Sequence, residues 1–166
     1  MKRLVLGLCC LLFLAQAAFA ESMKDVEAAM QKGETAYTES RFDDAAQDFE
    51  QAADILIKMK QVDNARAVYG NVAVVRMQQE RWQDALDVYA KIHALPGKIA
   101  PHTLVQMTKN TVVCAEKLHN YALKAEAVSK LLDAKVPLSP EDKLNFMALL
   151  GDAYKEAEMY GLACQA

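Results

Sequence analysis

The apolar positions of this chain recur at intervals of three and four residues over most of its length. Phe49, Ala52, Ala53, Leu56 and Ile57, for example, fall on a single stripe. This spacing is typical of helices that bury one face. No segment after residue 20 alternates apolar and polar residues for long enough to indicate a strand. We therefore predict an all-α fold.

Four prolines mark two joints between the predicted helices. Pro96 and Pro101 bracket one joint, and Pro137 and Pro140 bracket the other. Because proline lacks a backbone N–H and clashes inside a helix, both segments are predicted to be loops. Ser139 before Pro140 is typical of a helix start, with serine as the N-cap and proline at the first helical position.

Aromatic residues recur at a spacing of about 40 residues, as Phe42, Trp82, Tyr121 and Tyr160. Nine positions before each aromatic stands a small or aliphatic residue, and three positions after it stands alanine in three of the four cases. The residues before are Gly33, Ala73, Val112 and Gly151, and those after are Ala45, Ala85, Lys124 and Ala163.

This order of residues predicts repeated helical hairpins. A small residue on the first helix lets the second helix approach closely. The aromatic residue packs between the two helices at the turn, and the alanine on the second helix faces the first. One hairpin cannot bury its apolar face alone, so hairpins must stack. The predicted repeats span residues 24–63, 64–98, 101–136 and 139–166, the last one incomplete.

The pattern resembles the tetratricopeptide repeat (TPR) family over nearly all of residues 21–166. In order of the repeats, the resemblance rests on Gly33, Phe42, Ala45, Phe49 and Ala52; on Tyr69, Ala73, Trp82, Ala85 and Tyr89; on Val112, Ala115, Tyr121 and Val128; and on Leu150, Gly151, Tyr154, Tyr160 and Ala163. It implies a right-handed solenoid of antiparallel hairpins with about 3.5 repeats. The period near 40 departs from the family's usual 34, and a HEAT-like solenoid has a similar period.

The resemblance also implies a concave groove, lined by the first helix of each hairpin, that binds a peptide or helix of another protein. The expected groove residues are Met30, Glu34, Tyr37, Asn71, Val74, Met77, Gln78, Lys109, Asn110, Val113, Lys117, Asn145, Asp152 and Lys155. Some family members grip a C-terminal carboxylate with a clamp of Lys, Asn and Arg. Glu34 stands where the first groove Asn would be, which argues against that clamp here.

The fourth repeat reaches Ala166 only three residues after Ala163. Three explanations remain open: a truncated chain, an end that pairs with another chain, and a frayed last hairpin. The second of these makes self-association, with a structural role, the alternative to partner binding in the groove.

Residues 1–20 have the pattern of a secretory signal peptide. Lys2 and Arg3 precede the apolar run Leu4–Leu14, and Ala18-Phe19-Ala20 forms a small-residue cleavage site. The apolar run is too short for a bilayer, which needs about 20 residues. We predict an exported protein, periplasmic or secreted, without a membrane span after cleavage.

The composition and the absence of known catalytic motifs argue against several functions for this chain. A net charge of −3 with no basic run argues against nucleic-acid binding. The chain contains no H-E-x-x-H, G-x-S-x-G or phosphate-binding glycine loop, so neither catalysis nor a cofactor is expected. A metal-binding accessory using His93, His102 and Cys114 is the weakest alternative, because two histidines make an incomplete site. Cys114 and Cys164 either form a disulfide after export or are separately buried in helices.

Overall fold

The computed structural model describes the backbone of residues 22–163 and the side chains of residues 22–158. Helices and no strand occur within these residues, which confirms the all-α prediction. The chain divides into two compact units, one ending at Val75 and the other beginning at Arg76. The predicted signal peptide and the side chains of Tyr160, Ala163 and Cys164 lie outside the described part.

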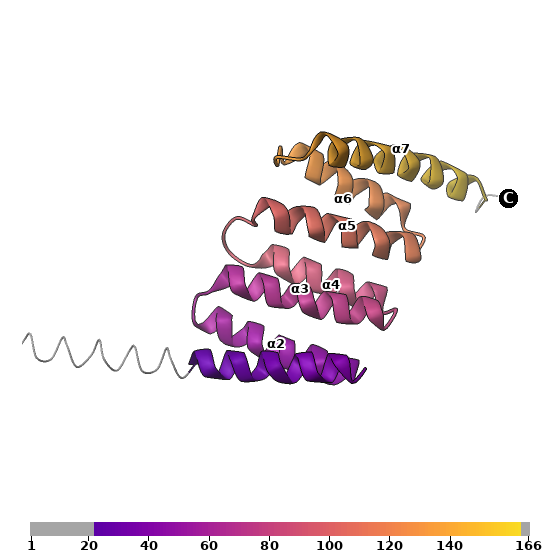
Figure 1. Ribbon diagram of the computed structural model, residues 1–166. Coiled ribbons are helices and arrows are strands. Elements are labelled where there is room, and N and C mark those ends of the chain that lie inside the picture. The colour runs from indigo at the N-terminus through magenta and orange to yellow at the C-terminus, as the bar shows by residue number, and fades with distance from the viewer. Residues whose placement is uncertain (1–21, 164–166) are drawn as a thin grey trace, which may run out of the picture. The chain divides into compact units, whose positions relative to one another are not determined.

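The first unit contains a helix over residues 22–38, then α2 (Phe42–Lys58) and most of α3 (Val62–Gln78) (Figure 1). Phe49 on α2 packs directly against Gly33 of the first helix. A Cβ atom at Gly33 would lie 2.7 Å from the Cδ1 and Cε1 atoms of the Phe49 ring. Glycine allows this close packing, because a larger residue there would force the Phe49 ring or its helix to shift.

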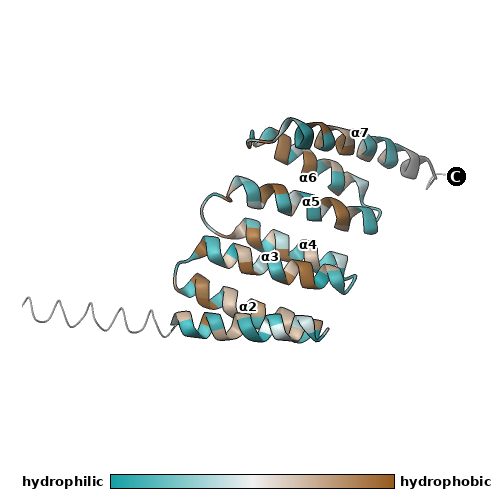
Figure 2. Cartoon of the chain, in the orientation of Figure 1, coloured by the Kyte–Doolittle hydropathy of each residue, from teal (hydrophilic) through white to brown (hydrophobic). Residues whose placement is uncertain are grey.

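The second unit contains α4 (Trp82–Ala94), α5 (Pro101–Lys117), α6 (Tyr121–Asp133) and α7 (Pro140–Ala163). Helices that follow one another in the chain pack together, α4 on α5, α5 on α6 and α6 on α7. A core of Val112, Val128, Leu131 and Phe146 joins the last three of these helices. Figure 2 shows hydrophobic and hydrophilic residues interleaved along the helices, as expected when each one buries a single face.

Five helices are followed by a non-glycine residue in the left-handed region, and four of these helices end in the same way. Ser40, Lys60, Glu80 and His119 have φ values of 60, 62, 57 and 53°. In each case the next residue donates its N–H to a carbonyl five residues back, as Arg41 does to Ala36 at 2.8 Å. This pattern is the Schellman motif, and the next helix begins two residues after the left-handed residue. The predicted turns at Phe42, Trp82 and Tyr121 are confirmed, since each of these residues is the first of a helix.

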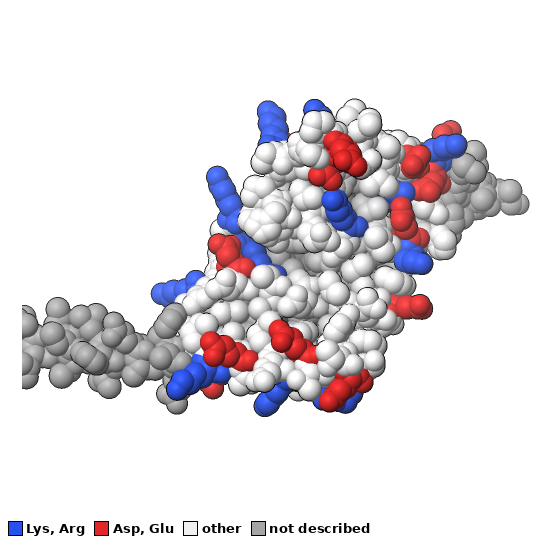
Figure 3. All heavy atoms as spheres, viewed as in Figure 1, with Lys and Arg blue, Asp and Glu red and all other residues white. Residues whose placement is uncertain are grey.

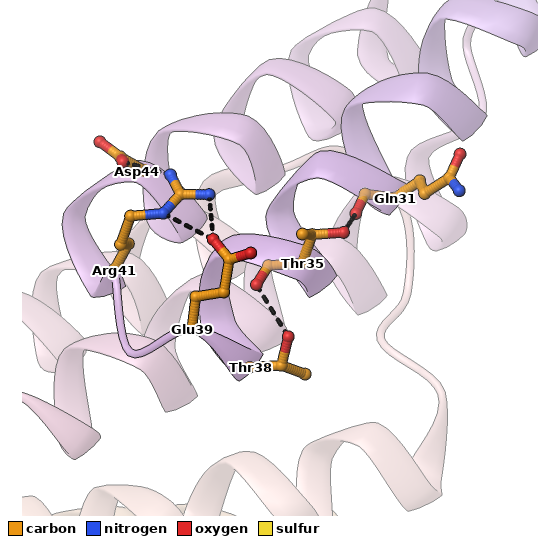
Figure 4. Close-up of polar contacts among 6 residues, drawn as sticks. All are labelled: Gln31, Thr35, Thr38, Glu39, Arg41 and Asp44. Atoms are coloured by element: carbon orange, nitrogen blue, oxygen red, sulfur yellow. Dashed lines mark hydrogen bonds and ion pairs between the residues drawn. The ribbon is translucent and has the colours of Figure 1, made fainter.

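Polar contacts fix the first of these turns (Figure 4). Thr38 Oγ1 donates to the carbonyl of Thr35 at 2.8 Å, within the last turn of the first helix. Arg41 then binds Glu39 at 2.7 Å and Asp44 at 2.5 Å across the turn. The hydrogen bonds that Arg41 donates to the carboxylates of Glu39 and Asp44 raise the pKa of Arg41 above its ordinary value.

Both proline-bracketed segments are loops, as predicted. The first lies between the end of α4 at Ala94 and the start of α5 at Pro101. In the second, α7 begins at Pro140, and Ser139 Oγ accepts the N–H of Asp142 at 3.0 Å. The predicted serine N-cap is therefore confirmed.

Most of the predicted hairpin-packing residues lie in the interior. The buried ones are Gly33, Ala45, Phe49, Ala52, Tyr69, Ala73, Ala85, Tyr89, Val112, Ala115 and Val128. The three aromatics that begin helices are half-buried, namely Phe42, Trp82 and Tyr121.

The predicted fourth hairpin is wrong. Helix α7 runs unbroken from Pro140 to Ala163, so Tyr160 does not stand at a turn. Residues 155–158 are strong helix formers that favour continuation. Gly151 and Tyr154 were predicted to pack against a second helix, yet both are exposed, Tyr154 by 59%. Within the described residues, no helix covers that face of α7.

Residues 22–163 include no helix that combines the length and the apolar character needed to cross a bilayer.

Candidate functional site

The first unit contains a hollow that brings together four of the predicted groove residues. Glu34 and Tyr37 reach it from the first helix, and Asn71 and Val74 reach it from α3. The hollow has a volume of about 440 Å³, and Thr38, Phe49 and Val75 complete its lining. Residues nearly 40 positions apart in the sequence thus form one surface depression.

The lining combines an apolar floor with a polar rim. Phe49 and Val75 are almost wholly buried, at 4% and 1% exposure, and form the floor. Val74 is 39% exposed, and Glu34 and Asn71 are exposed at the rim. Such a hollow suits an apolar side chain, while the carboxylate and the amide are available to polar groups beside it.

Neighbouring contacts hold the walls of the hollow in place. The rings of Tyr37 and Phe42 meet edge to face, with centroids 5.6 Å apart. Gly33 allows Phe49 to lie directly on the first helix. Tyr69 on α3 donates a hydrogen bond to Asp54 on α2, which ties the two helices together. Burial raises the pKa of Tyr69, so its hydroxyl stays protonated as the donor.

The remaining predicted groove residues do not line this hollow. Met30 is half-buried on the first helix, one turn before Glu34. Eight others lie in the second unit as exposed or half-buried residues, namely Met77, Gln78, Lys109, Asn110, Val113, Asn145, Asp152 and Lys155. The last of the set, Lys117, also lies in the second unit, with its Nζ 5.8 Å from the centroid of the Trp82 ring.

Three of the predicted groove residues, Met77, Lys109 and Asn110, are held by contacts inside the second unit. Asn110 donates to the hydroxyl of Tyr89 at 2.6 Å, and that hydroxyl lies 3.8 Å from the sulfur of Met77. Burial raises the pKa of Tyr89 to about 12. Lys109 joins α5 to α7 through an ion pair of 3.1 Å with Asp142. We infer that these side chains stabilise the unit in addition to any binding role.

A buried lysine stands where the repeat pattern expects alanine. Only 3% of the Lys124 side chain is exposed, and its Nζ lies 2.8 Å from Glu116 on α5 and 3.0 Å from Glu156 on α7. Burial lowers the pKa of Lys124, but the hydrogen bonds to both carboxylates outweigh this effect and raise it above the ordinary value. The cation therefore links three helices.

The second unit has a hollow of its own that sequence reasoning missed. It has a volume of about 660 Å³ and lies between α4 and α6, with α5 as its floor. Its lining includes Ala90 on α4 and Ala127 on α6, whose side chains are small. The chain is rich in alanine throughout, so the sequence carries no signal that singles out these two.

The groups considered for catalysis or metal binding are dispersed or buried. Among the described residues, no group of three His, Cys, Asp or Glu lies close enough to hold a metal ion. Cys114 is wholly buried, and burial raises the pKa of its thiol to about 11. Its possible disulfide partner, Cys164, lies outside the described residues.

Acidic and basic side chains are interspersed within each unit on the face drawn in Figure 3. The hollow of the first unit differs locally, because Glu34 is the one charged residue in its lining. Comparisons of the chain with protein-family models, with curated proteins and with solved structures find no match.

Proposed function

We propose that this chain is a non-enzymatic interaction protein whose first unit binds a peptide or short helix of another protein. The single observation that carries the proposal is the hollow formed by Glu34, Tyr37, Asn71 and Val74. These residues come from two helices and surround an apolar floor, which is the arrangement that seats a side chain of a bound peptide.

The lining also defines the chemistry of the partner. An apolar side chain would fill the space above Phe49 and Val75, where it would leave water. Glu34 would attract a lysine or arginine next to it, and Asn71 can bind the peptide backbone through both its donor and its acceptor. The preferred ligand is thus an apolar residue flanked by a basic one.

The architecture is proposed to be a TPR-like array of helical hairpins, working in the cell envelope after export. The recurring Schellman turns at Ser40, Lys60, Glu80 and His119 support the array, because α2, α3, α4 and α6 all follow the same kind of turn. The pattern of residues 1–20 supports the export.

Selection from a displayed library of random peptides tests this function. We expect the selected peptides to share an apolar residue next to Lys or Arg. Val74→Glu should weaken their binding by roughly tenfold or more, because it places a charge on the apolar wall. Glu34→Gln should reduce the preference for the basic residue.

The matched control is Leu118→Glu, which changes an apolar residue of similar exposure, 38%, in the second unit. It should leave peptide binding unchanged. Selected peptides that bind Val74→Glu as well as the unaltered chain would contradict the proposal, and so would a selection that yields no peptide at all.

A further inference from the structure

Helix α7 carries an exposed apolar stripe on one face. Leu144, Met147 and Tyr154 are exposed by 68, 55 and 59%. The other exposed large apolar residues in the described part reach only 38–39%. Together with Gly151 the three follow the alternating spacing of three and four residues that defines a coiled-coil seam.

The opposite face of α7 is already packed. Phe146 and Ala153 are buried, at 1% and 0% exposure, and Glu156 binds Lys124 on α6. The stripe is therefore a second apolar face on the same helix. Surface helices normally have one such face, and an additional one marks an interaction site.

Gly151 forms a notch in the middle of the stripe. A Cβ atom built at this residue would meet no atom within 4 Å, apart from its own neighbours and helix backbone. Met147 and Tyr154 flank the notch on either side along the helix. A side chain from another helix can therefore reach the backbone here, as Phe49 does at Gly33.

The stripe is complementary to itself when two copies of α7 run antiparallel. In that register Leu144 lies opposite Tyr154 of the second copy, and Met147 faces the notch at Gly151. The charges agree with this arrangement, because Glu141 on the rim then lies beside Lys155 of the second copy. A parallel pair would separate positions 141 and 155 by 14 residues, or about 21 Å along the helix.

We propose that α7 is a self-association surface on which a second copy of the chain docks antiparallel about a twofold axis. Met147 of each copy fills the notch at Gly151 of the other, and two Glu141–Lys155 pairs close the rim. A single helix pair gives a small interface, so the dimer is weak and depends on concentration. This surface is independent of the hollow in the first unit.

Light scattering of the purified chain over a dilution series tests the proposal. We expect a monomer–dimer equilibrium. Met147→Glu should weaken the dimer by roughly tenfold or more, because it places a carboxylate in the notch. Leu118→Glu is the control and should associate like the unaltered chain. A monomer at every concentration, or a dimer unaffected by Met147→Glu, would overturn the proposal.

A charge exchange tests the antiparallel register separately. Lys155→Glu should weaken the dimer, because it places two carboxylates beside each other. Adding Glu141→Lys to this variant should restore association, because each ion pair then has its two charges exchanged between positions 141 and 155. If the double variant associates no better than Lys155→Glu alone, the antiparallel register is wrong.

Discussion

Two glycines, one in each unit, occupy the same place in the repeat pattern but have opposite surroundings. Gly33 is buried under the ring of Phe49, and its hydrogen is all that the space allows. Gly151 lies on the exposed face of α7 with no atom near the place of a Cβ. A glycine at this position therefore marks a close contact only where a second helix covers it. Where none does, the same residue leaves a notch open to a partner.

Ala45 and Lys124 hold the same position in the repeat pattern but stabilise the contact between helices in different ways. Ala45 on α2 is fully buried, and its small side chain lets helices approach. Lys124 on α6 holds the equivalent position and is also buried, but its Nζ extends to Glu116 and Glu156. Helix α2 relies on small size at this position, as α4 does with the fully buried Ala85, whereas α6 relies on an ion triad.

The largest effect is expected from removal of that triad. Lys124→Ala leaves Glu116 and Glu156 without their shared cation and removes the buried methylene chain. The free energy of unfolding should fall by about 2–4 kcal/mol. Lys124→Met keeps the chain length and should lose only about 1 kcal/mol, since both carboxylates are half-exposed to water. Urea unfolding followed by the fluorescence of Trp82 measures both, and a Lys124→Met variant as stable as the unaltered chain would refute a role for the charge.

The next largest loss of stability is expected from substitution of Gly33, the glycine covered by Phe49. Gly33→Ala brings a Cβ within 2.7 Å of the Phe49 ring, and we expect a net loss of about 1–2 kcal/mol after the gain in helix propensity. Gly70→Ala is the matched control, because a Cβ there meets nothing within 4 Å. It should gain about 0.5–1 kcal/mol. Urea unfolding followed by circular dichroism compares the two, and a gain in both would show that Phe49 does not press on Gly33.

Substitution of the uncovered glycine, Gly151, should change the free energy of unfolding in the opposite direction. Gly151→Ala has room for its methyl group and should stabilise the monomer by about 0.5–1 kcal/mol. The measurement is urea unfolding in dilute solution, where monomer dominates. A loss as large as that of Gly33→Ala would mean that a helix covers this face after all.

The smallest effect concerns the start of α7. Hydrogen bonds from Lys109 and then Ser139 lower the pKa of Asp142. A carboxyl group whose pKa is lowered by folding stabilises the protein above its unfolded pKa, and this contribution is lost as the pH falls through the folded value. The Tm difference between the unaltered chain and Asp142→Asn should therefore shrink below about pH 4. Asp152→Asn, on the same helix, serves as the control, and an Asp142 difference that does not change with pH would contradict the assignment.

Local patterns in the sequence predicted much of the fold. The spacing of Phe49, Ala52 and Leu56 indicated a helix, the prolines marked two loops, and Pro140 marked a helix start. The left-handed turns could not be predicted, because Ser40, Lys60, Glu80 and His119 are neither glycine nor asparagine. Neither could the continuation of α7 beyond Tyr154, where repeat register suggested a turn and helix propensity prevailed.

The site was predictable only in part. Glu34, Tyr37, Asn71 and Val74 were named from the family resemblance, and the structure brings them into one hollow; their role in binding stays a prediction. Phe49 as its floor depends on tertiary packing against Gly33. The partners of Lys124 lie 8 and 32 residues away, so no local pattern could have paired them.

Mapping of the bound peptide by amide chemical shifts tests the central claim most directly. A peptide selected on the chain is titrated into labelled protein at a concentration where the chain is monomeric. We predict that the amides of Glu34, Tyr37, Asn71 and Val74 shift with one common dissociation constant, while those of Leu144 and Met147 on α7 stay in place. Shifts on α7 with none around the hollow would contradict the assignment of partner binding to the first unit.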